Sequence, residues 1–449
     1  MFLIFLCKVV NLYDIIEKIY KYIGIEIHIK EMILLANEDV KVNPQDIVEK
    51  TTIADVYRAV KNLDGVISKT KLIYSEFFSN LSHNEIYIKP ENLQKTGSFK
   101  LRGAYNCISQ LSPEQKARGV IAASAGNHAQ GVAFAAQQLG VKAVIVMPAT
   151  TPLLKVEATK AFGAEVVLSG DSFDDAAAKA VELQKEFNYT FIHPFNDIEV
   201  ILGQGTTALE IIDDLKDVDV ILVPVGGGGF ASGVAVATKM VNPHVKVIGV
   251  EPCGAACIKA SLQEGKVTSL SNVETVAEGT AVKTPGDITF EFIKKYVDEI
   301  ITVSEFEIMS ALLFLIEKHK LIAEGAGVLS LAASRKLKFK NKKVVSIVSG
   351  GNIDISTISA LIDKSLVVRG RVFCFSVELP DKPGQLLAIS QILADLNANV
   401  IKLDHNQAKV TDSFKKVVLE VTVETNGLEH IHHITDKLHE NGFKIKKIY

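Results

Sequence analysis

Between residues 50 and 363, short apolar runs alternate with longer segments whose apolar positions recur at helical spacing. The short runs predict buried strands, and the longer segments predict helices. Such alternation is typical of parallel sheets with helices on both faces, so the pattern predicts an α/β fold. The expected strands are 86–88, 119–123, 141–147, 165–168, 190–193, 220–225 and 344–348, and the expected helices include 151–162, 173–187 and 230–240.

The pattern changes after residue 366. A strand is expected at 372–379, a helix at 385–396, strands at 400–405 and 416–424, a helix at 428–441 and a strand at 443–448. The order β-α-β-β-α-β predicts a ferredoxin-like α+β domain. The chain is therefore expected to divide into an N-terminal extension (1–48), an α/β domain (49–365) and a C-terminal domain (370–449).

The charge, cysteine content and apolar runs of the chain bear on its partners and its cellular compartment. A formal net charge of -3 over 449 residues gives no reason to expect a nucleic-acid partner. The five cysteines are odd in number and scattered, which favours a reducing compartment, the cytoplasm, over a disulfide framework. No apolar run is long enough to span a bilayer.

The first seven residues are apolar but lack a positively charged region before them, so a signal peptide is not expected. Met32 begins a more ordinary sequence. We expect residues 1–31 to be dispensable, with Met32 as an alternative start.

Four stretches carry candidate chemistry, and each lies at the end of an expected strand or the start of the following helix. Because ligands of parallel sheets bind at the carboxyl ends of strands, one site could collect all four. The stretches are 91–104 (ENLQKTGSFKLRGA), 124–131 (SAGNHAQG), 226–229 (GGGG) and 349–352 (SGGN).

Lys100 is expected in the first turn of a helix that Ser98 caps. The positive end of the helix dipole and burial both lower the pKa of an amine there, and a neutral amine can form a Schiff base with a carbonyl. The ordinary alternative is a solvated surface lysine. The other three stretches favour the functional interpretation.

The glycines at 226–229 lie between an apolar strand and a helix, where exposed backbone N–H groups form an anion site. No Gly-Lys-Ser/Thr follows, which excludes a P-loop. The stretch also fits G-x-G-x-x-A, with Glu251 about twenty residues further on, which is formally a dinucleotide fingerprint. A nicotinamide oxidoreductase is thus one alternative, but it would have no use for Lys100 or the Asn127 loop.

The S-F-K-x-R-G-A and S-x-G-N-H elements, in this order, resemble the pyridoxal-phosphate enzymes of fold type II, the tryptophan-synthase-β type. Within them, residues 50–366 look most like the threonine dehydratase (threonine ammonia-lyase) family. The tail, with its D-K-P-G loop, resembles an ACT domain, a small amino-acid-sensing module. The resemblance implies pyridoxal 5'-phosphate as cofactor and a catalytic domain of two subdomains, the smaller at about 85–188.

The resemblance also implies residue roles. Lys100 would bond covalently to the cofactor beside Phe99, Asn127 would lie beside its 3-hydroxyl and Ser349 would face its pyridine nitrogen. The phosphate would bind Gly226, Gly227, Gly228 and Gly229, and the substrate carboxylate would bind Ser124, Ala125, Gly126, Asn127 and His128. His128 is expected to serve structure rather than catalysis. A small effector would bind near Asp381, Lys382, Pro383 and Gly384, although a structural or dimerising appendage is the alternative for this domain.

A neutral hydroxyl at Ser349 cannot keep the pyridine nitrogen protonated, which favours β-elimination over transamination. The implied reaction converts L-threonine to 2-oxobutanoate and ammonia, and L-serine to pyruvate. Serine racemase is the nearest rival, but racemases of this fold carry Ser where this chain has Ala125. A non-catalytic amino-acid sensor is a further alternative.

Glu251 and Ala255 match a cation site of some relatives, but Cys257 replaces an Asp there. Because a thiolate suits soft metals, no divalent metal site is expected. Pairing of ACT edge strands would make the protein a homodimer or homotetramer. The sequence leaves open whether the role is biosynthetic or catabolic and which effector binds.

Overall fold

The computed structural model describes residues 43–406 and 416–449. The chain divides into two units, residues 1–49 and residues 50–449. In the first unit the described part is residues 43–49, which include all of helix α3 (Pro44–Lys50) except its last residue. The expectation that residues 1–31 are dispensable falls outside the described residues.

The larger of two α/β sheets has six strands in the order β1-β2-β10-β7-β8-β9. Only the β1–β2 pair is antiparallel among these described strands. In this sheet β2, β10 and β7 are neighbours, so the loops that follow their carboxyl ends meet at one edge. The bounds are β1 Ile73–Tyr74, β2 Glu85–Pro90, β7 Val220–Pro224, β8 Lys246–Pro252, β9 Glu299–Val303 and β10 Lys343–Val348.

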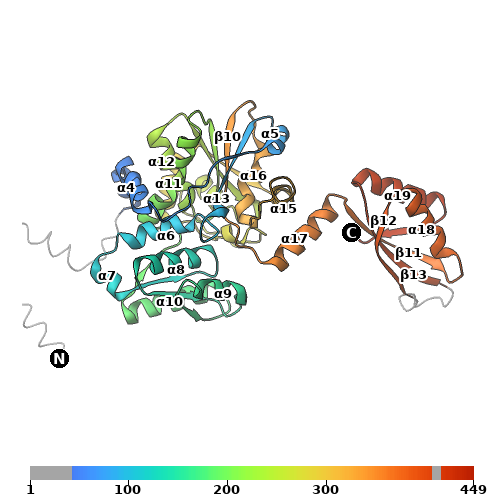
Figure 1. Ribbon diagram of the computed structural model, residues 1–449, viewed down its shortest axis with the longest axis horizontal. Helices are drawn as coiled ribbons and strands as arrows, with labels where there is room; N and C mark the ends of the chain where they lie inside the picture. Colours follow the sequence, from blue (N-terminus) through green and yellow to red (C-terminus); the bar gives the residue numbers. More distant parts are fainter. Residues whose placement is uncertain (1–42, 407–415) are drawn as a thin grey trace, which may run out of the picture. The chain divides into compact units, whose positions relative to one another are not determined.

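Two hydrophobic cores lie on opposite faces of this sheet, because side chains alternate along each strand. In β7, Val220 and Leu222 pack with α5, α15 and α16, whereas Ile221 and Val223 pack with α4, α11 and α12. Figure 1 shows these helices around the sheet. The bounds are α4 Ile53–Leu63, α5 Glu76–Ser82, α11 Ile198–Asp214, α12 Gly229–Val241, α13 Cys257–Glu264, α14 Asp287–Tyr296, α15 Glu305–Phe314, α16 Leu329–Ala333 and α17 Ile355–Val368.

The second sheet is parallel, with four strands in the order β5-β4-β3-β6. The expected limits of the smaller subdomain, 85 and 188, are wrong for this sheet. The strand at 85–90 pairs with β10 in the six-stranded sheet, whereas β6 beyond residue 188 pairs with β3. The bounds are β3 Val120–Ala123, β4 Ala143–Met147, β5 Glu165–Leu168, β6 Thr190–Phe191, α6 Lys100–Ser109, α7 Pro113–Arg118, α8 Asn127–Leu139, α9 Leu153–Lys160 and α10 Phe173–Phe187.

Short helical turns complete this region. They are η1 Glu91–Leu93, η2 Cys253–Ala255, η3 Glu278–Thr280, the π-helical turn η4 Leu315–His319, η5 Gly325–Val328 and η6 Ser334–Lys336.

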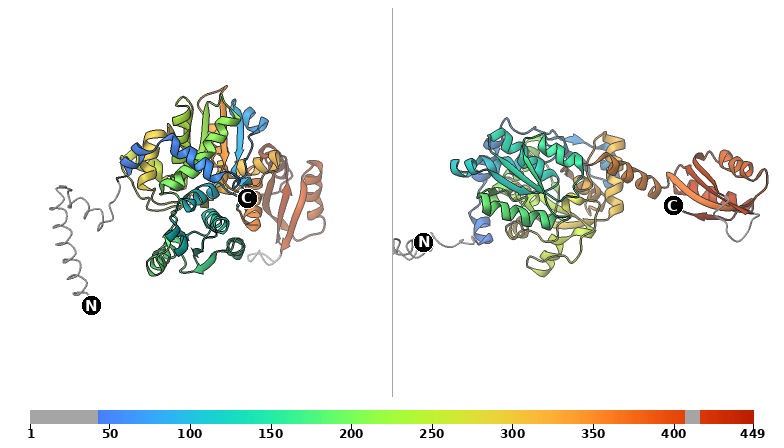
Figure 2. Two further views of the ribbon diagram at one scale, coloured as in Figure 1. Left: turned by 60° about the vertical axis from the view of Figure 1, so that its left-hand side comes forward. Right: turned by 90° about the horizontal axis from the view of Figure 1, so that it is seen from below.

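The C-terminal domain is an antiparallel sheet in the order β12-β13-β11-β14 with two helices, which confirms the ferredoxin-like prediction. Alternate residues of the strands pack with both helices, so one face of the sheet carries the core. Figure 2 shows this domain, drawn orange to red, from two further directions. The bounds are β11 Val372–Pro380, α18 Gln385–Asp395, β12 Asn399–Asn406, β13 Lys416–Glu424, α19 Leu428–Glu440 and β14 Ile445–Lys447. Across the described parts of the chain, no helix combines the length and apolar character needed to cross a membrane.

Candidate active site

Lys100 is the first residue of α6, but Ser98 does not cap this helix as the sequence predicted. The N-cap position is Phe99, and the buried Ser98 hydroxyl finds no hydrogen-bond partner among the residues that the structure describes. Ser98 instead forms an antiparallel bridge with Gly350, and the Phe99 N–H donates to Ser349 O (3.1 Å). Phe99, with φ -58° and ψ -20°, already has helical backbone angles, and Ser98 before it pairs with the loop after β10. These contacts hold the stretch that bears Lys100 (the lysine loop, 91–104) against the stretch that begins with Ser349 (the serine loop, 349–352).

The Lys100 amine lies in protein surroundings that favour its neutral form. Its Nζ donates a hydrogen bond to Pro194 O (2.6 Å). Burial lowers the pKa of the amine to about 8, and the negative charge of Glu324 opposes this shift. A fraction of the amine is therefore neutral and nucleophilic near neutral pH.

Helix α6 is held in place by close backbone packing. A Cβ at Gly131 of α8 would lie 3.1 Å from the Lys100 carbonyl carbon, and one at Gly203 of α11 would lie 2.5 Å from Arg102 O. A side chain at either glycine would push away the helix that begins with Lys100.

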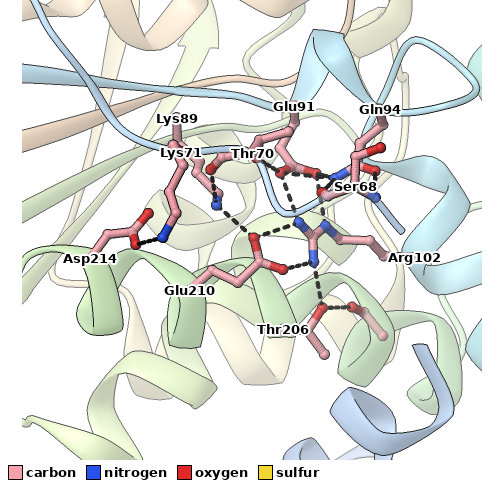
Figure 3. Close-up of polar contacts among 11 residues, drawn as sticks. Ser68, Thr70, Lys71, Lys89, Glu91, Gln94, Arg102, Thr206, Glu210 and Asp214 are labelled. Carbon is pink, nitrogen blue, oxygen red and sulfur yellow. Dashed lines mark hydrogen bonds and ion pairs between the residues drawn. The ribbon is translucent and has the colours of Figure 1, made fainter. Parts of the chain in front are cut away.

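A buried charge network also anchors α6 (Figure 3). The Arg102 guanidinium makes two-pronged contacts with Glu91 (2.8 and 2.9 Å) and with Glu210 (2.7 and 3.0 Å). Lys89 donates to Glu210 (2.6 Å) and to Thr70 O (2.5 Å). Burial alone would disfavour a charged Glu91, but Arg102 holds the pKa of that carboxyl below its usual range. The network joins the end of β2 to α6 and α11. Its member on α6, Arg102, is two residues after Lys100.

The glycine loop between β7 and α12 fits a phosphate group. Within residues 43–406 and 416–449, no hydrogen bond is donated by the backbone N–H groups of Gly226, Gly227 or Gly228. Gly228 has φ +96°, which favours glycine. A Cβ at Gly227 or Gly229 would lie 2.5 Å or 2.7 Å from Phe195. Unpaired donors at the start of a helix, on a backbone that allows close approach, are what an anionic group requires.

An aromatic stack joins the lysine and glycine loops. Phe99 lies over Phe230, the second residue of α12, with ring centroids 3.9 Å apart and planes at 13°. The stack brings the beginnings of α6 and α12 together.

The asparagine loop follows β3, and Asn127 is the first residue of α8. Asn127 Nδ2 donates to Glu324 Oε1 (2.6 Å), and Asn127 Oδ1 accepts from Asn352 Nδ2 (2.8 Å). The neighbouring His128 is buried, its Nε2 is 2.8 Å from Ile192 O, and burial lowers its pKa to about 3. His128 is thus neutral and held by backbone, while the Asn127 amide is oriented by two partners.

Ser349 directly follows β10 and is buried, with its hydroxyl 3.4 Å from Ala326 O. Its carbonyl accepts from Phe99, so Ser349 lies between the lysine loop and η5. The four stretches selected from the sequence are thereby connected by contacts among Phe99, Phe230, Ser349, Asn352 and Asn127.

Glu324 is an ionisable residue of this region that sequence reasoning missed. Burial raises the pKa of its carboxyl to about 7, and the Asn127 hydrogen bond opposes this. Glu324 precedes η5 in a loop without a recognisable motif, so its place beside Asn127 could not be read from the sequence. Asn352 and Pro194 were likewise missed as contacts of Asn127 and Lys100.

The other predicted residues are not members of the set of contacts just described. Glu251 accepts hydrogen bonds from the N–H groups of Ile258 and Lys259 at the start of α13, a local structural role. Cys257 Sγ is 3.6 Å from Gly226 O. Asp381, Lys382, Pro383 and Gly384 form the turn between β11 and α18, and Gly384 there has φ +94°.

Comparisons with known proteins give the family. Residues 63–350 match the family described as pyridoxal-phosphate dependent enzyme, and residues 375–443 match the ACT domain. A protein of Thermotoga maritima named L-threonine ammonia-lyase is 48% identical over 398 residues, which are 88% of this chain and 99% of that protein. The ACT match confirms the resemblance of the tail.

Two solved structures are similar over the α/β region. The processed form of threonine deaminase isoform 2 from Solanum lycopersicum is 41% identical, with a TM-score of 0.66 over 69% of this chain and 93% of that one. Maize serine racemase is 34% identical, with a TM-score of 0.67 over 71% of this chain and 98% of that one.

Proposed function

The chain belongs to the pyridoxal-phosphate dependent enzyme family, and from this we propose that it is a threonine ammonia-lyase. The enzyme converts L-threonine to 2-oxobutanoate and ammonia, and L-serine to pyruvate and ammonia. The observation that carries the proposal is the 48% identity to an L-threonine ammonia-lyase over nearly the whole of that relative, ACT region included.

The residues present fit pyridoxal phosphate, the cofactor of this family. We assign the covalent attachment to Lys100, the phosphate to the N–H groups at 226–229, and the ring to Phe99, Asn127 and Ser349. Unpaired N–H groups on a glycine backbone support the phosphate assignment, and the lowered amine pKa supports that of Lys100. When bound, the cofactor withdraws electrons from the substrate's α-carbon and so acidifies the α-proton.

Lys100 also moves protons in this proposal. Its neutral amine accepts the α-proton: the Cα–H bond breaks, an N–H bond forms and the electron pair stays on the substrate. The β-hydroxyl then leaves as water, with a proton from the Lys100 ammonium as one source. The enamine product is released and hydrolyses to the 2-oxo acid and ammonia. Backbone N–H groups of Ser124, Ala125 and Gly126 would hold the substrate carboxylate.

Ala125 supports dehydration over racemisation, the alternative suggested by the structural similarity to serine racemase. Inversion at the α-carbon needs a proton from the face opposite Lys100. A methyl side chain cannot supply it, so the carbanion is reprotonated from its original face or eliminates.

We further propose that the ACT domain binds a small effector, a branched amino acid such as isoleucine, near residues 381–384. Pairing of ACT edge strands would give a homodimer or homotetramer. The described cysteines, Cys107, Cys253, Cys257 and Cys374, form no disulfide, which supports a cytoplasmic location.

The test is turnover of L-threonine by the purified protein loaded with pyridoxal phosphate, with 2-oxobutanoate measured as product. Lys100→Ala should abolish turnover, while the cofactor can still bind through residues 226–229. A variant that kept a tenth of the wild-type rate would contradict the role of Lys100, because loss of a covalent catalyst costs far more.

A further inference from the structure

We propose that Glu324 is a positioning residue of the reaction centre, which fixes the Asn127 amide and supplies the negative charge that balances protonated Lys100. The proposal rests on the function proposed above. It assigns the structural support of that reaction to a residue outside the motifs of the lysine, glycine and asparagine loops.

The first argument is a chain of hydrogen bonds that ends on Glu324. Asn352 Nδ2 donates both to Thr96 O (2.7 Å) and to Asn127 Oδ1 (2.8 Å), and Asn127 Nδ2 donates to Glu324 Oε1 (2.6 Å). Because the Asn127 oxygen accepts from one partner and its nitrogen donates to another, its side-chain amide has one favoured orientation. Thr96 lies four residues before Lys100, so the chain connects the lysine loop to the carboxyl group.

The second argument is convergence around Gly350. A Cβ at Gly350 would lie 2.6 Å from Glu324 Oε1, 3.0 Å from Asn127 Nδ2 and 3.3 Å from Ser98 Cβ. Glu324 N–H also donates to Gly350 O (3.1 Å). Only glycine allows the carboxyl group, the amide and the lysine loop to meet at this point.

The third argument is that only one of the two carboxyl oxygens of Glu324 has a protein hydrogen-bond partner among the described residues. Among the described residues, no hydrogen bond reaches Glu324 Oε2, whereas Oε1 is held by Asn127. Glu324 is half-buried and Oε2 is not enclosed by the protein, so this oxygen remains accessible.

The charges that face these groups agree with this role. Glu324 interacts electrostatically with Lys100 of α6, Lys155 of α9 and Glu278 of η3. Lys155 also lies 3.6 Å from the largely exposed Glu278. Lys100 in turn interacts electrostatically with Glu324, His128 and His193. When Lys100 takes a proton from the substrate, Glu324 is the carboxylate whose charge stabilises the ammonium.

The experiment compares Glu324→Gln with Glu324→Asp in the full chain freed of cofactor. Glutamine keeps an oxygen that can accept from Asn127 but removes the charge, whereas aspartate keeps the charge and shortens the reach. Lys100 is trapped with formaldehyde and a borohydride reagent across a pH series, and the modified peptide is quantified by mass spectrometry. This readout reports the neutral amine directly and needs no catalysis.

Removal of an opposing charge should lower the trapping midpoint of Lys100 by about one pH unit in Glu324→Gln, whereas Glu324→Asp should retain the wild-type midpoint. Glu278→Gln is the matched control, because it removes a neighbouring carboxylate that water screens. The pH midpoint of Lys100 trapping should be the same in this variant as in the wild type. With cofactor restored, Glu324→Gln should also shift the pH profile of kcat, while KM should stay close to the wild-type value.

A Glu324→Gln midpoint equal to that of Glu278→Gln would overturn the proposal, as would a midpoint that rises. If Glu324→Gln does not fold, an unchanged midpoint in Glu324→Ala decides against it. A shifted midpoint in a protein that does not turn over L-threonine would keep the Glu324 proposal and reject the proposed function.

Discussion

The buried network of Figure 3 allows a quantitative prediction about what holds the Lys100 helix in place. Glu91 is fully buried and accepts hydrogen bonds from Arg102 (2.8 and 2.9 Å), Thr70 Oγ1 (2.7 Å) and Gln94 Nε2 (3.2 Å). In the buried part of this network the positive charges of Lys89 and Arg102 balance the negative charges of Glu91 and Glu210. Glu91→Gln preserves shape but leaves one buried positive charge without compensation.

Breaking one partner of a buried ion pair typically costs about 3–5 kcal/mol, and here the amide also turns donors toward a guanidinium. A native protein has only about 5–15 kcal/mol to lose. With an unfolding entropy of about 2.1 cal/mol/K per residue and roughly 300 residues in the domain, the loss corresponds to a fall of about 5–8 °C in Tm. Thermal unfolding followed by near-ultraviolet circular dichroism measures this fall.

The matched control is Glu182→Gln. Glu182 pairs with Lys179 at 2.7 Å on the surface of α10, where its side chain is 62% exposed. An exposed pair of this kind contributes less than about 1 kcal/mol, so its Tm should hardly change.

A double-variant cycle isolates the pair. Glu91→Leu combined with Arg102→Met removes one charge of each sign and leaves Lys89 paired with Glu210. The double variant should lose less stability than the sum of the single variants, by about 1–3 kcal/mol. Additive single effects, or a Glu91→Gln Tm equal to that of Glu182→Gln, would refute the view that the network anchors α6.

Three further predictions concern activity and pH. Chiral analysis of a reaction started from L-serine should find pyruvate with negligible D-serine; D-serine at a comparable rate would show that another group replaces the missing acid at Ala125. A chain truncated after Lys364 should keep catalysis. It should no longer release heat on addition of isoleucine in calorimetry, and isoleucine should no longer change its affinity for substrate. A full chain that binds no amino acid outside the active site would contradict the effector assignment. Burial lowers the pKa of His128 to about 3 and that of His193 to about 4, which makes stability rise with pH up to about 6.5, whereas burial raises the pKa of Glu324 and of Glu251 to about 7, which makes stability fall over nearly the same range; Glu324→Gln removes one of the opposing groups, so its urea midpoint should rise more steeply between about pH 4.5 and 6.5 than that of the wild type, and equal slopes would contradict this.

The sequence by itself determined the elements and most of the chemistry. Helix 173–187 and strand 416–424 have the predicted bounds, because apolar spacing, capping residues and turn residues are local signals. The loops that bear Lys100, Asn127, 226–229 and Ser349 were likewise recognisable, because glycines and small polar residues after a buried strand have few other uses.

Only the tertiary structure decided which segments share a sheet and which distant residues meet. Strand 85–90 pairs with a strand about 260 positions later, so its own sequence could not place it in the larger sheet. Serine is a residue type favoured at helix N-caps, but Ser98 pairs with Gly350 and does not cap the helix. Glu324 acquires its surroundings from α6, α8, α9 and η3, because electrostatic environment is set by proximity in space and not by neighbours in sequence.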